Sequence, residues 1–294
     1  MTATERGALL ALLRLPGQSW PAVADDVEAA GSALEVLCQG PAGQLPLFAD
    51  EAGAVSQAEA AEDEIAGWER DGIRFLTILD PDYPAQLLTV HQRPPFLTFR
   101  GRLDPADARS VAVVGTRQAT ERGLRDAAEL AGGLAEAGVP VVSGLAAGID
   151  TAALRAALEA QGRAVAVLGT GLRRSYPREN AGLQERIARE GLVISQFMPD
   201  APPAKFTFPM RNAVMSGYSA ATVVVEAPYR SGARMQARLA LEHGRQVFLL
   251  ESLLANDWAQ GYARRPNTTV VRTVADVLDH LKSALVTDQE LVWA

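Results

Sequence analysis

The stretch Val111-Ala-Val-Val-Gly-Thr-Arg117 decides the fold. Its four apolar residues predict a short buried strand, Gly115 permits a tight turn, and the amphipathic segment 122–137 predicts a helix. A strand that turns directly into a helix points several backbone N–H groups and a helix N-terminus at one place, which suits a phosphate. Arg117 adds a planar pair of donors that can bind a phosphate bidentately. The alternative is a tight turn that carries a solvated arginine, and this segment alone leaves both open.

The alternation of strand and helix continues toward the C-terminus. The expected strands are 139–142, 164–168, 192–195, 221–225, 246–250 and 268–271, and the expected helices are 149–160, 179–189, 234–242 and 275–281. Short apolar strands between amphipathic helices indicate a mostly parallel sheet with helices on both faces. We therefore predict an α/β fold with an extended, Rossmann-like, doubly wound sheet.

The N-terminal part lacks this alternation of strands and helices. Residues 1–40 have apolar residues at helical spacing, which predicts short helices. Residues 40–60 are rich in Ala, Gly, Pro and acidic residues, which predicts a linker with one short helix. Strand-like runs follow at 73–79 and 96–99. We expect a small helical domain plus acidic linker over residues 1–65 and a Rossmann-like domain over residues 66–294.

Acidic charge is concentrated in the N-terminal part. The whole chain of 294 residues has a net charge of −7, but residues 1–70 hold 3 basic and 12 acidic residues, and residues 71–294 hold 25 and 23. A local basic groove therefore remains available in the larger part. No apolar run reaches the roughly 18 residues that cross a membrane. The N-terminus has no basic region ahead of its apolar stretch, so we expect a cytoplasmic protein without a signal peptide.

Several classes of catalytic site are disfavoured. Cys38 is the single cysteine, and His91, His243 and His280 are far apart in the sequence, so we expect no metal and no histidine-based catalytic triad. The full Gly-x-Gly-x-x-Gly fingerprint and the Gly-x-x-x-x-Gly-Lys motif are both absent, which argues against a classical dehydrogenase or a P-loop ATPase. We expect neither a cofactor nor an enzymatic activity.

Two further strands end in glycine turns. Ser143-Gly-Leu-Ala-Ala-Gly-Ile-Asp-Thr151 follows the second strand, and Gly169-Thr-Gly171 follows the third. The carboxyl ends of parallel strands meet at one edge of the sheet, where ligands of such folds bind. Three such turns together indicate a built site, although loops that need positive φ angles would look the same. Within the second turn, Asp150 could accept backbone N–H groups or a ligand hydroxyl.

These motifs and others downstream resemble, in order, those of the DprA/Smf family of DNA-processing proteins, over roughly residues 70–285. Residues 1–40 resemble the small helical, SAM-like domain that often precedes this core. The matching elements are Gly115-Thr-Arg-x-x-Thr120, Ser143–Thr151, Tyr176-Pro-x-x-Asn180, Ile194-Ser195, Phe208-Pro-x-Arg-Asn212, Glu226-Ala227, Ser231-Gly232 and Gly244-Arg245, with Asp82-Tyr-Pro84 and Pro94-Pro95 upstream.

The resemblance implies a protein that binds single-stranded DNA and protects it, helps to load a RecA-type recombinase during natural transformation or recombination, and forms a homodimer through its Rossmann-like domain. The residues that we expect to contact the strand are Gly115, Thr116, Arg117, Thr120, Ser143, Gly144, Gly148, Gly169, Lys205, Phe208, Arg211, Asn212, Ser231 and Gly232, with Arg173 and Arg174 as additional basic contacts.

Lys205 and Phe208 lie at positions that contact the strand in the family. Lys205 is one of two lysines in the chain, and Phe208, three residues later, offers a ring on which a base can stack. Both Phe206 and Phe208 could instead belong to the core. We assign that role to Phe206, because Pro209 and Arg211 suggest that a helix starts near the site at Phe208.

The chain also departs from the family pattern. Leu154 stands where the family usually has a histidine, Gln196 where it has a glutamate, Ala213 where it often has an arginine, and Ala233 where it has a small polar residue. We therefore expect a divergent member, without the C-terminal winged-helix domain of some relatives. The alternatives are a nucleotide-hydrolysing, phosphoribohydrolase-like enzyme and a nucleotide sensor in a defence system. The segment 226–234 lacks the glycine cluster of the phosphoribohydrolases.

Overall fold

The computed structural model describes residues 3–40 and 51–281. Internal contacts divide the chain into two units, and we describe each by itself. The expected boundary at residue 65 stays a prediction about independently folding domains. Unit 1 comprises Met1–Arg100, Thr170–Arg174 and Ile194–Pro202, and unit 2 comprises Gly101–Gly169, Ser175–Val193 and Pro203–Ala294.

Unit 1 contains the predicted short helices near the N-terminus. Of the linker expected over residues 40–60, residues 41–50 lie outside the described part of the chain, and residues 51–60 belong to the 20-residue helix α4. Its buried residues Ala54, Ala58, Ala61, Ile65 and Trp68 recur every three to four positions, which is the spacing of one helix face. The elements are α1 (Ala3–Arg14), α2 (Trp20–Ala30), α3 (Ala33–Gln39), α4 (Glu51–Arg70), β1 (Arg74–Thr77), α5 (Ala85–Leu88) and β2 (Phe96–Gly101).

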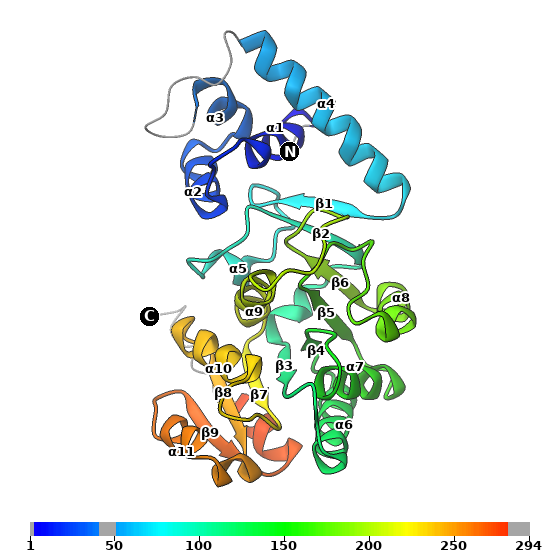
Figure 1. Cartoon of the computed structure of the whole chain (residues 1–294), viewed down its shortest axis with the longest axis vertical. Coiled ribbons are helices and arrows are strands. Elements are labelled where there is room, and N and C mark those ends of the chain that lie inside the picture. The colour runs from blue at the N-terminus through cyan, green and yellow to red at the C-terminus, as the bar shows by residue number, and fades with distance from the viewer. Residues whose placement is uncertain (1–2, 41–50, 282–294) are drawn as a thin grey trace. The chain divides into compact units, whose positions relative to one another are not determined.

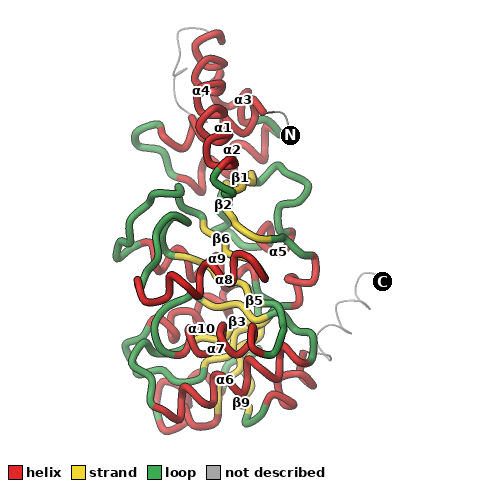
Figure 2. Tube along the Cα trace, turned by 90° about the vertical axis from the view of Figure 1, so that its right-hand side faces the viewer, coloured by secondary structure: helices red, strands yellow, loops and turns green. Residues whose placement is uncertain are grey.

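Unit 2 holds the strand–helix alternation that the sequence predicts, which Figure 2 shows in yellow and red. Helix α9 was expected only as a helix start near Phe208, and α11 was not expected. The elements are β3 (Val111–Val114), α6 (Glu121–Glu136), β4 (Val141–Ser143), α7 (Ile149–Glu159), β5 (Ala164–Leu168), α8 (Ala181–Glu190), β6 (Leu192–Ser195), α9 (Thr207–Tyr218), β7 (Ala221–Val224), α10 (Gly232–Glu242), β8 (Gln246–Leu250), α11 (Asp257–Ala263) and β9 (Thr268–Val271), with a last helical segment at 274–281.

The strands form a mostly parallel sheet in the order β1-β2-β6-β5-β4-β3-β7-β8-β9. β3 pairs in parallel with β4 and with β7, while β1 and β2 pair antiparallel. In unit 2, helices α6, α7 and α8 lie on one side of the strands and α9 and α10 on the other (Figure 1). The α/β, doubly wound fold is therefore confirmed.

The central strand β3 is buried on both faces, as its unbroken apolar run predicts. Val111, Ala112 and Val113 have no exposed surface. The chain runs from β3 to β4 on one side and returns to β7 on the other, so the strand order reverses at β3. Loops that leave neighbouring strands in opposite directions leave a crevice at such a switch point, and ligands bind there in open α/β sheets.

A buried polar cluster ties the end of one helix of unit 2 to the segment before β3. The Asp107 carboxylate is 1% exposed and accepts hydrogen bonds from Arg163 (Nη2, 2.6 Å) and from the Tyr218 hydroxyl (2.6 Å). Burial and the Asp107 charge raise the pKa of Tyr218 well above its usual value, so the hydroxyl keeps its proton and donates. The cluster links residues that are 111 positions apart in the sequence.

Within residues 3–40 and 51–281, we find no helix with the length and apolar character that crossing a membrane requires.

Candidate functional site

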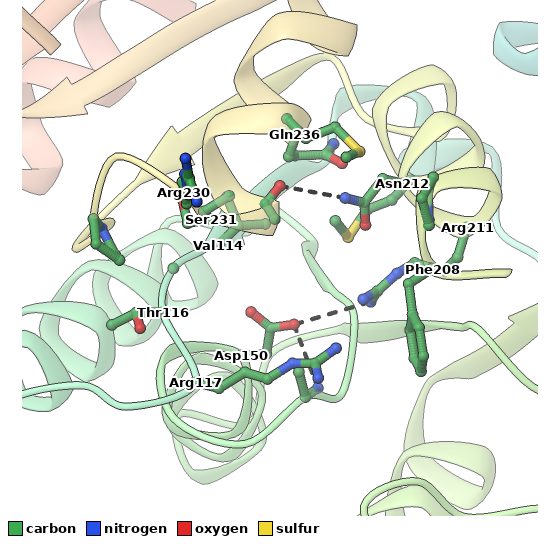
Figure 3. A pocket seen from close by; sticks show the side chains of 18 of the residues that line it. Val114, Thr116, Arg117, Asp150, Phe208, Arg211, Asn212, Arg230, Ser231 and Gln236 are labelled. Atoms are coloured by element: carbon green, nitrogen blue, oxygen red, sulfur yellow. Dashed lines mark hydrogen bonds and ion pairs between the residues drawn. The ribbon is translucent and has the colours of Figure 1, made fainter. Parts of the chain in front are cut away.

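A cavity of about 480 Å³ opens in unit 2 at the carboxyl ends of β3, β4 and β7, at the switch point. It is lined by the loop after β3, the start of α7, one face of α9, and the loop and first turns of α10 (Figure 3). The lining residues are Val114, Gly115, Thr116, Arg117, Gln118, Ala146, Asp150, Phe208, Pro209, Arg211, Asn212, Met215, Pro228, Arg230, Ser231, Gly232, Ala233, Met235 and Gln236.

The loop after β3 is fastened to the end of β7. The Thr116 N–H donates to the Glu226 carbonyl (2.7 Å). The Thr120 N–H and hydroxyl donate to the Glu226 carboxylate (3.1 and 2.9 Å). The Thr120 hydroxyl also accepts from the Gly123 N–H (3.0 Å) and so caps helix α6. Thr120 therefore fixes the loop and does not line the cavity, whereas the three residues Gly115, Thr116 and Arg117 do.

The turn after β4 is organised by Asp150. Its carboxylate accepts from the backbone N–H groups of Gly144 (3.2 Å) and Ala146 (3.3 Å), which confirms the loop-organising role considered for it. The Asn180 amide donates to the Leu145 carbonyl (2.9 Å) from the other side of the turn. Ser143 has no exposed surface, and its hydroxyl donates to the Val113 carbonyl of β3 (2.7 Å), so it links the start of the turn to the neighbouring strand.

A buried ion pair forms the floor of the cavity. Arg211 Nη1 lies 3.9 Å from the Asp150 carboxylate, and the two side chains are 7% and 8% exposed. Burial raises the pKa of Asp150, and the Arg211 charge and the N–H groups of the turn oppose that shift. A side chain at Gly144 would displace Arg211 from this position, because a Cβ there would fall 1.2 Å from Arg211 Nη1. Gly148, at the start of α7, belongs to the same turn.

Arg117 and Phe208 form one wall of the cavity. The Arg117 guanidinium lies 5.1 Å from the centre of the Phe208 ring, within range of a cation–π interaction. The Tyr176 ring packs against Phe208 at 5.5 Å between centres. Gly169 lets the ring lie close to the end of β5, because a Cβ there would fall 2.7 Å from Phe208 Cδ1. Figure 3 shows the Arg117, Asp150 and Arg211 side chains converging beside Phe208.

The N-terminus of α10 forms the opposite wall. Ser231 caps this helix by accepting from the Arg234 N–H (3.1 Å), and the Asn212 amide donates to the Gly232 carbonyl (3.3 Å). A helix N-terminus carries a partial positive charge. Because Arg211 is paired with Asp150, the lining keeps the charges of Arg117 and Arg230 for an anionic ligand.

The predicted residues thus fall into two groups. Eight of them line the cavity, while Thr120, Ser143, Gly144, Gly148 and Gly169 shape the surrounding loops. Their contacts with DNA stay predictions. The eight lining residues are Gly115, Thr116, Arg117, Phe208, Arg211, Asn212, Ser231 and Gly232.

Three basic residues that we predicted to contact the strand do not line the cavity. Lys205 is exposed and precedes α9 in unit 2. In unit 1, Arg173 pairs with Asp71 and with Asp200 (2.7 Å), and Arg174 donates to the Asp200 carbonyl (3.3 Å). The charge of Arg173 is therefore already engaged by two carboxylates, although its contact with DNA stays a prediction.

One assignment was wrong, and some lining residues were missed. Phe206 was assigned to the core but is 67% exposed, because α9 turns its next residue, Thr207, inward instead. Met215 and Gln236 line the cavity. Their spacing from Arg211 and Gly232, four residues in each case, places them on the same helix faces and could have identified them.

The chain matches the family model described as DNA recombination-mediator protein A over residues 74–283. It belongs to the DNA recombination-mediator protein A family. The matched residues include all of the cavity-lining segments. The predicted family resemblance is therefore confirmed.

Relatives and solved structures agree with this family. The chain is 44% identical over 181 residues to protein Smf of Synechocystis, covering 60% of this chain and 46% of that protein. It is 40% identical over 185 residues to DNA processing protein DprA of Streptococcus pneumoniae, covering 63% and 65%. The chain thus spans about half to two thirds of these relatives.

Two solved structures share the fold. The X-ray structure of DprA from Streptococcus pneumoniae superposes with a TM-score of 0.76 at 30% identity, covering 95% of this chain and 98% of that chain. DprA from Helicobacter pylori, whose structure was reported for its single-stranded DNA binding mode, gives a TM-score of 0.63 at 26% identity, covering 71% and 96%.

Proposed function

We propose that the cavity of unit 2 binds single-stranded DNA. The observation that carries this proposal is the pairing of Arg117 with Phe208, 5.1 Å apart, opposite the N-terminus of α10. A cation and a helix N-terminus hold phosphate, and an aromatic ring stacks on a base of any identity. This combination suits a strand bound without sequence preference. The proposal is also supported by the Helicobacter pylori relative, whose structure was reported for its single-stranded DNA binding mode.

The wider role that we propose is protection of single strands and loading of a RecA-type recombinase by a homodimer in the cytoplasm. It rests on membership of the recombination-mediator family. Nucleotide hydrolysis is less well supported. Among the described residues that line the cavity, Asp150 is the one carboxylate, and it is engaged by Arg211 and by two backbone N–H groups. A carboxylate held in this way is poorly placed to activate water.

The direct test of this function is fluorescence-anisotropy titration of labelled oligo-dT at several salt concentrations. We expect binding that weakens as salt rises, because phosphate contacts release counterions. Incubation with nucleoside monophosphates, followed by analysis for free base, tests the enzymatic alternative. Absence of binding at low salt together with release of free base would contradict the proposal.

The Lys205→Ala variant gives a second expected result. Lys205 is exposed beside the start of α9, so its loss should leave the fold intact. We expect weaker binding to strands of every base composition, and a salt slope shallower by about 0.7, as for one lost contact to a single-strand phosphate. Arg238→Ala is the matched control, since Arg238 is a half-exposed cation paired with Glu242 on α10 and is not part of the cavity. An unchanged salt slope in Lys205→Ala would show that Lys205 does not contact the strand.

A further inference from the structure

Tyr229 is a large aromatic residue on the surface of unit 2 that the site described above does not use. It is 61% exposed and lies in the loop between β7 and α10. Its neighbours in the chain, Pro228 and Arg230, both line the cavity. Figure 3 places Arg230 and Ser231 across the cavity from Phe208. The loop that carries Tyr229 therefore borders the cavity on the side away from the Phe208 wall.

The Tyr229 ring is held in place by Arg234. The Arg234 guanidinium lies 4.3 Å from the centre of the Tyr229 ring, and Arg234 Nη1 donates to the Tyr229 carbonyl (3.2 Å). The same guanidinium lies 6.0 Å from the ring of Tyr262, which is 5% exposed. Arg234 thus contacts the exposed Tyr229 ring, the Tyr229 backbone and the buried Tyr262 ring. A preorganised ring loses less conformational entropy when a ligand stacks on it.

Tyr229 and Arg234 repeat the chemistry of the wall formed by Arg117 and Phe208. There, Arg117 lies over Phe208 at 5.1 Å; here, Arg234 lies over Tyr229 at 4.3 Å. Aromatic rings and arginine planes are the groups on which unpaired bases stack, and arginine also attracts the adjoining phosphate. Arg230 and the N-terminus of α10, which follow Tyr229 in the chain, line the cavity and suit the backbone that would join the two stacked bases.

We propose that Tyr229 and Arg234 form a second base-stacking platform, so that one single strand crosses the cavity with bases stacked at both sides. The ligand is a nucleobase of the same strand that occupies the Phe208 wall. This inference rests on the proposed function, because it requires that a single strand enter the cavity. It adds a stacking subsite on the loop between β7 and α10.

The test compares Tyr229→Ala with Tyr229→Phe on two labelled strands, oligo-dT and a strand of equal length made of abasic sites. Loss of one stacked base should weaken oligo-dT binding about fivefold or more in Tyr229→Ala. Tyr229→Phe keeps the ring and should bind like the unchanged protein. On the abasic strand, which offers phosphates without bases, Tyr229→Ala should bind like the unchanged protein as well. Leu124→Ala, another exposed apolar residue of unit 2, is the control.

Equal binding of oligo-dT by Tyr229→Ala and the unchanged protein overturns the platform. So does a loss in Tyr229→Ala that is equally large on the abasic strand, because the ring would then act on the loop and not on a base. If the unchanged protein binds neither strand at low salt, the proposed function itself fails, and the platform with it.

Discussion

Arg117→Ala should weaken the binding of oligo-dT by about tenfold to 150-fold, the largest loss that we expect from any single change in the cavity. A hydrogen-bonded contact to a charged group contributes about 1.5–3 kcal/mol. The same guanidinium lies 5.1 Å from the centre of the Phe208 ring, so its loss also removes the contact that helps to position the stacking ring. Anisotropy titration at one fixed salt concentration measures the effect.

Arg117→Lys separates the effect of the charge from that of the planar guanidinium. Lysine keeps the positive charge but lacks the planar fork that binds phosphate bidentately and stacks on an aromatic face. We therefore expect an affinity between those of the unchanged protein and Arg117→Ala, with the salt slope retained. The site assignment would be contradicted if Arg117→Ala bound as tightly as the Arg238→Ala control.

The second large effect concerns stability. Asp107→Ala should lower the free energy of unfolding by about 3–5 kcal/mol, the cost of removing one partner from a buried ion pair. The carboxylate is 1% exposed and accepts from both Arg163 and the Tyr218 hydroxyl. Its loss leaves the buried hydroxyl without its acceptor and leaves the 15% exposed Arg163 with the Arg102 carbonyl as its remaining acceptor. Urea unfolding followed by circular dichroism measures the change.

Tyr218→Phe is the matched control for this cluster. It removes one hydroxyl and leaves the Asp107–Arg163 pair intact, so we expect a loss of about 1–2 kcal/mol. A loss in Asp107→Ala no larger than that in Tyr218→Phe would show that the ion pair adds nothing to the hydrogen bond. Neither residue lines the cavity, so DNA affinity per folded molecule should be unchanged.

The parts of the site that could be predicted are those encoded locally. Four apolar residues followed by Gly115 mark the end of a buried strand, because burial on both faces and a tight turn each demand particular residues. The three glycine turns then meet at one sheet edge, since parallel strands end there. The same reasoning placed Asp150 within its own turn, where it accepts two backbone N–H groups only four and six residues away.

The parts that could not be predicted depend on contacts between distant residues. Arg211 was expected to face the ligand, and it does line the cavity, but its pairing with Asp150, 61 positions earlier, has no local signal. The charge of Arg173 is likewise engaged by Asp71, 102 positions away. Phe206 and Phe208 look alike in sequence, and only the phase of α9 decides which ring meets the cavity.

The departures from the family pattern lie mostly in the interior. Leu154 has no exposed surface in α7, and Ala213 is 4% exposed in α9, so both pack in the core and do not line the cavity. Gln196 is also 4% exposed. Ala233 alone of the four lines the cavity. The divergence therefore leaves Arg117, Phe208 and the start of α10 in place as the groups that we propose bind the strand.

The central claim is that a single strand binds in the cavity at the switch point of unit 2. Hydrogen–deuterium exchange of the protein with and without oligo-dT tests it most directly, because it reports each segment of the backbone separately. We expect the strand to slow exchange at 115–118, at 206–212 and at 229–234. Slowed exchange confined to α1–α4, with these three segments unchanged, would contradict the account.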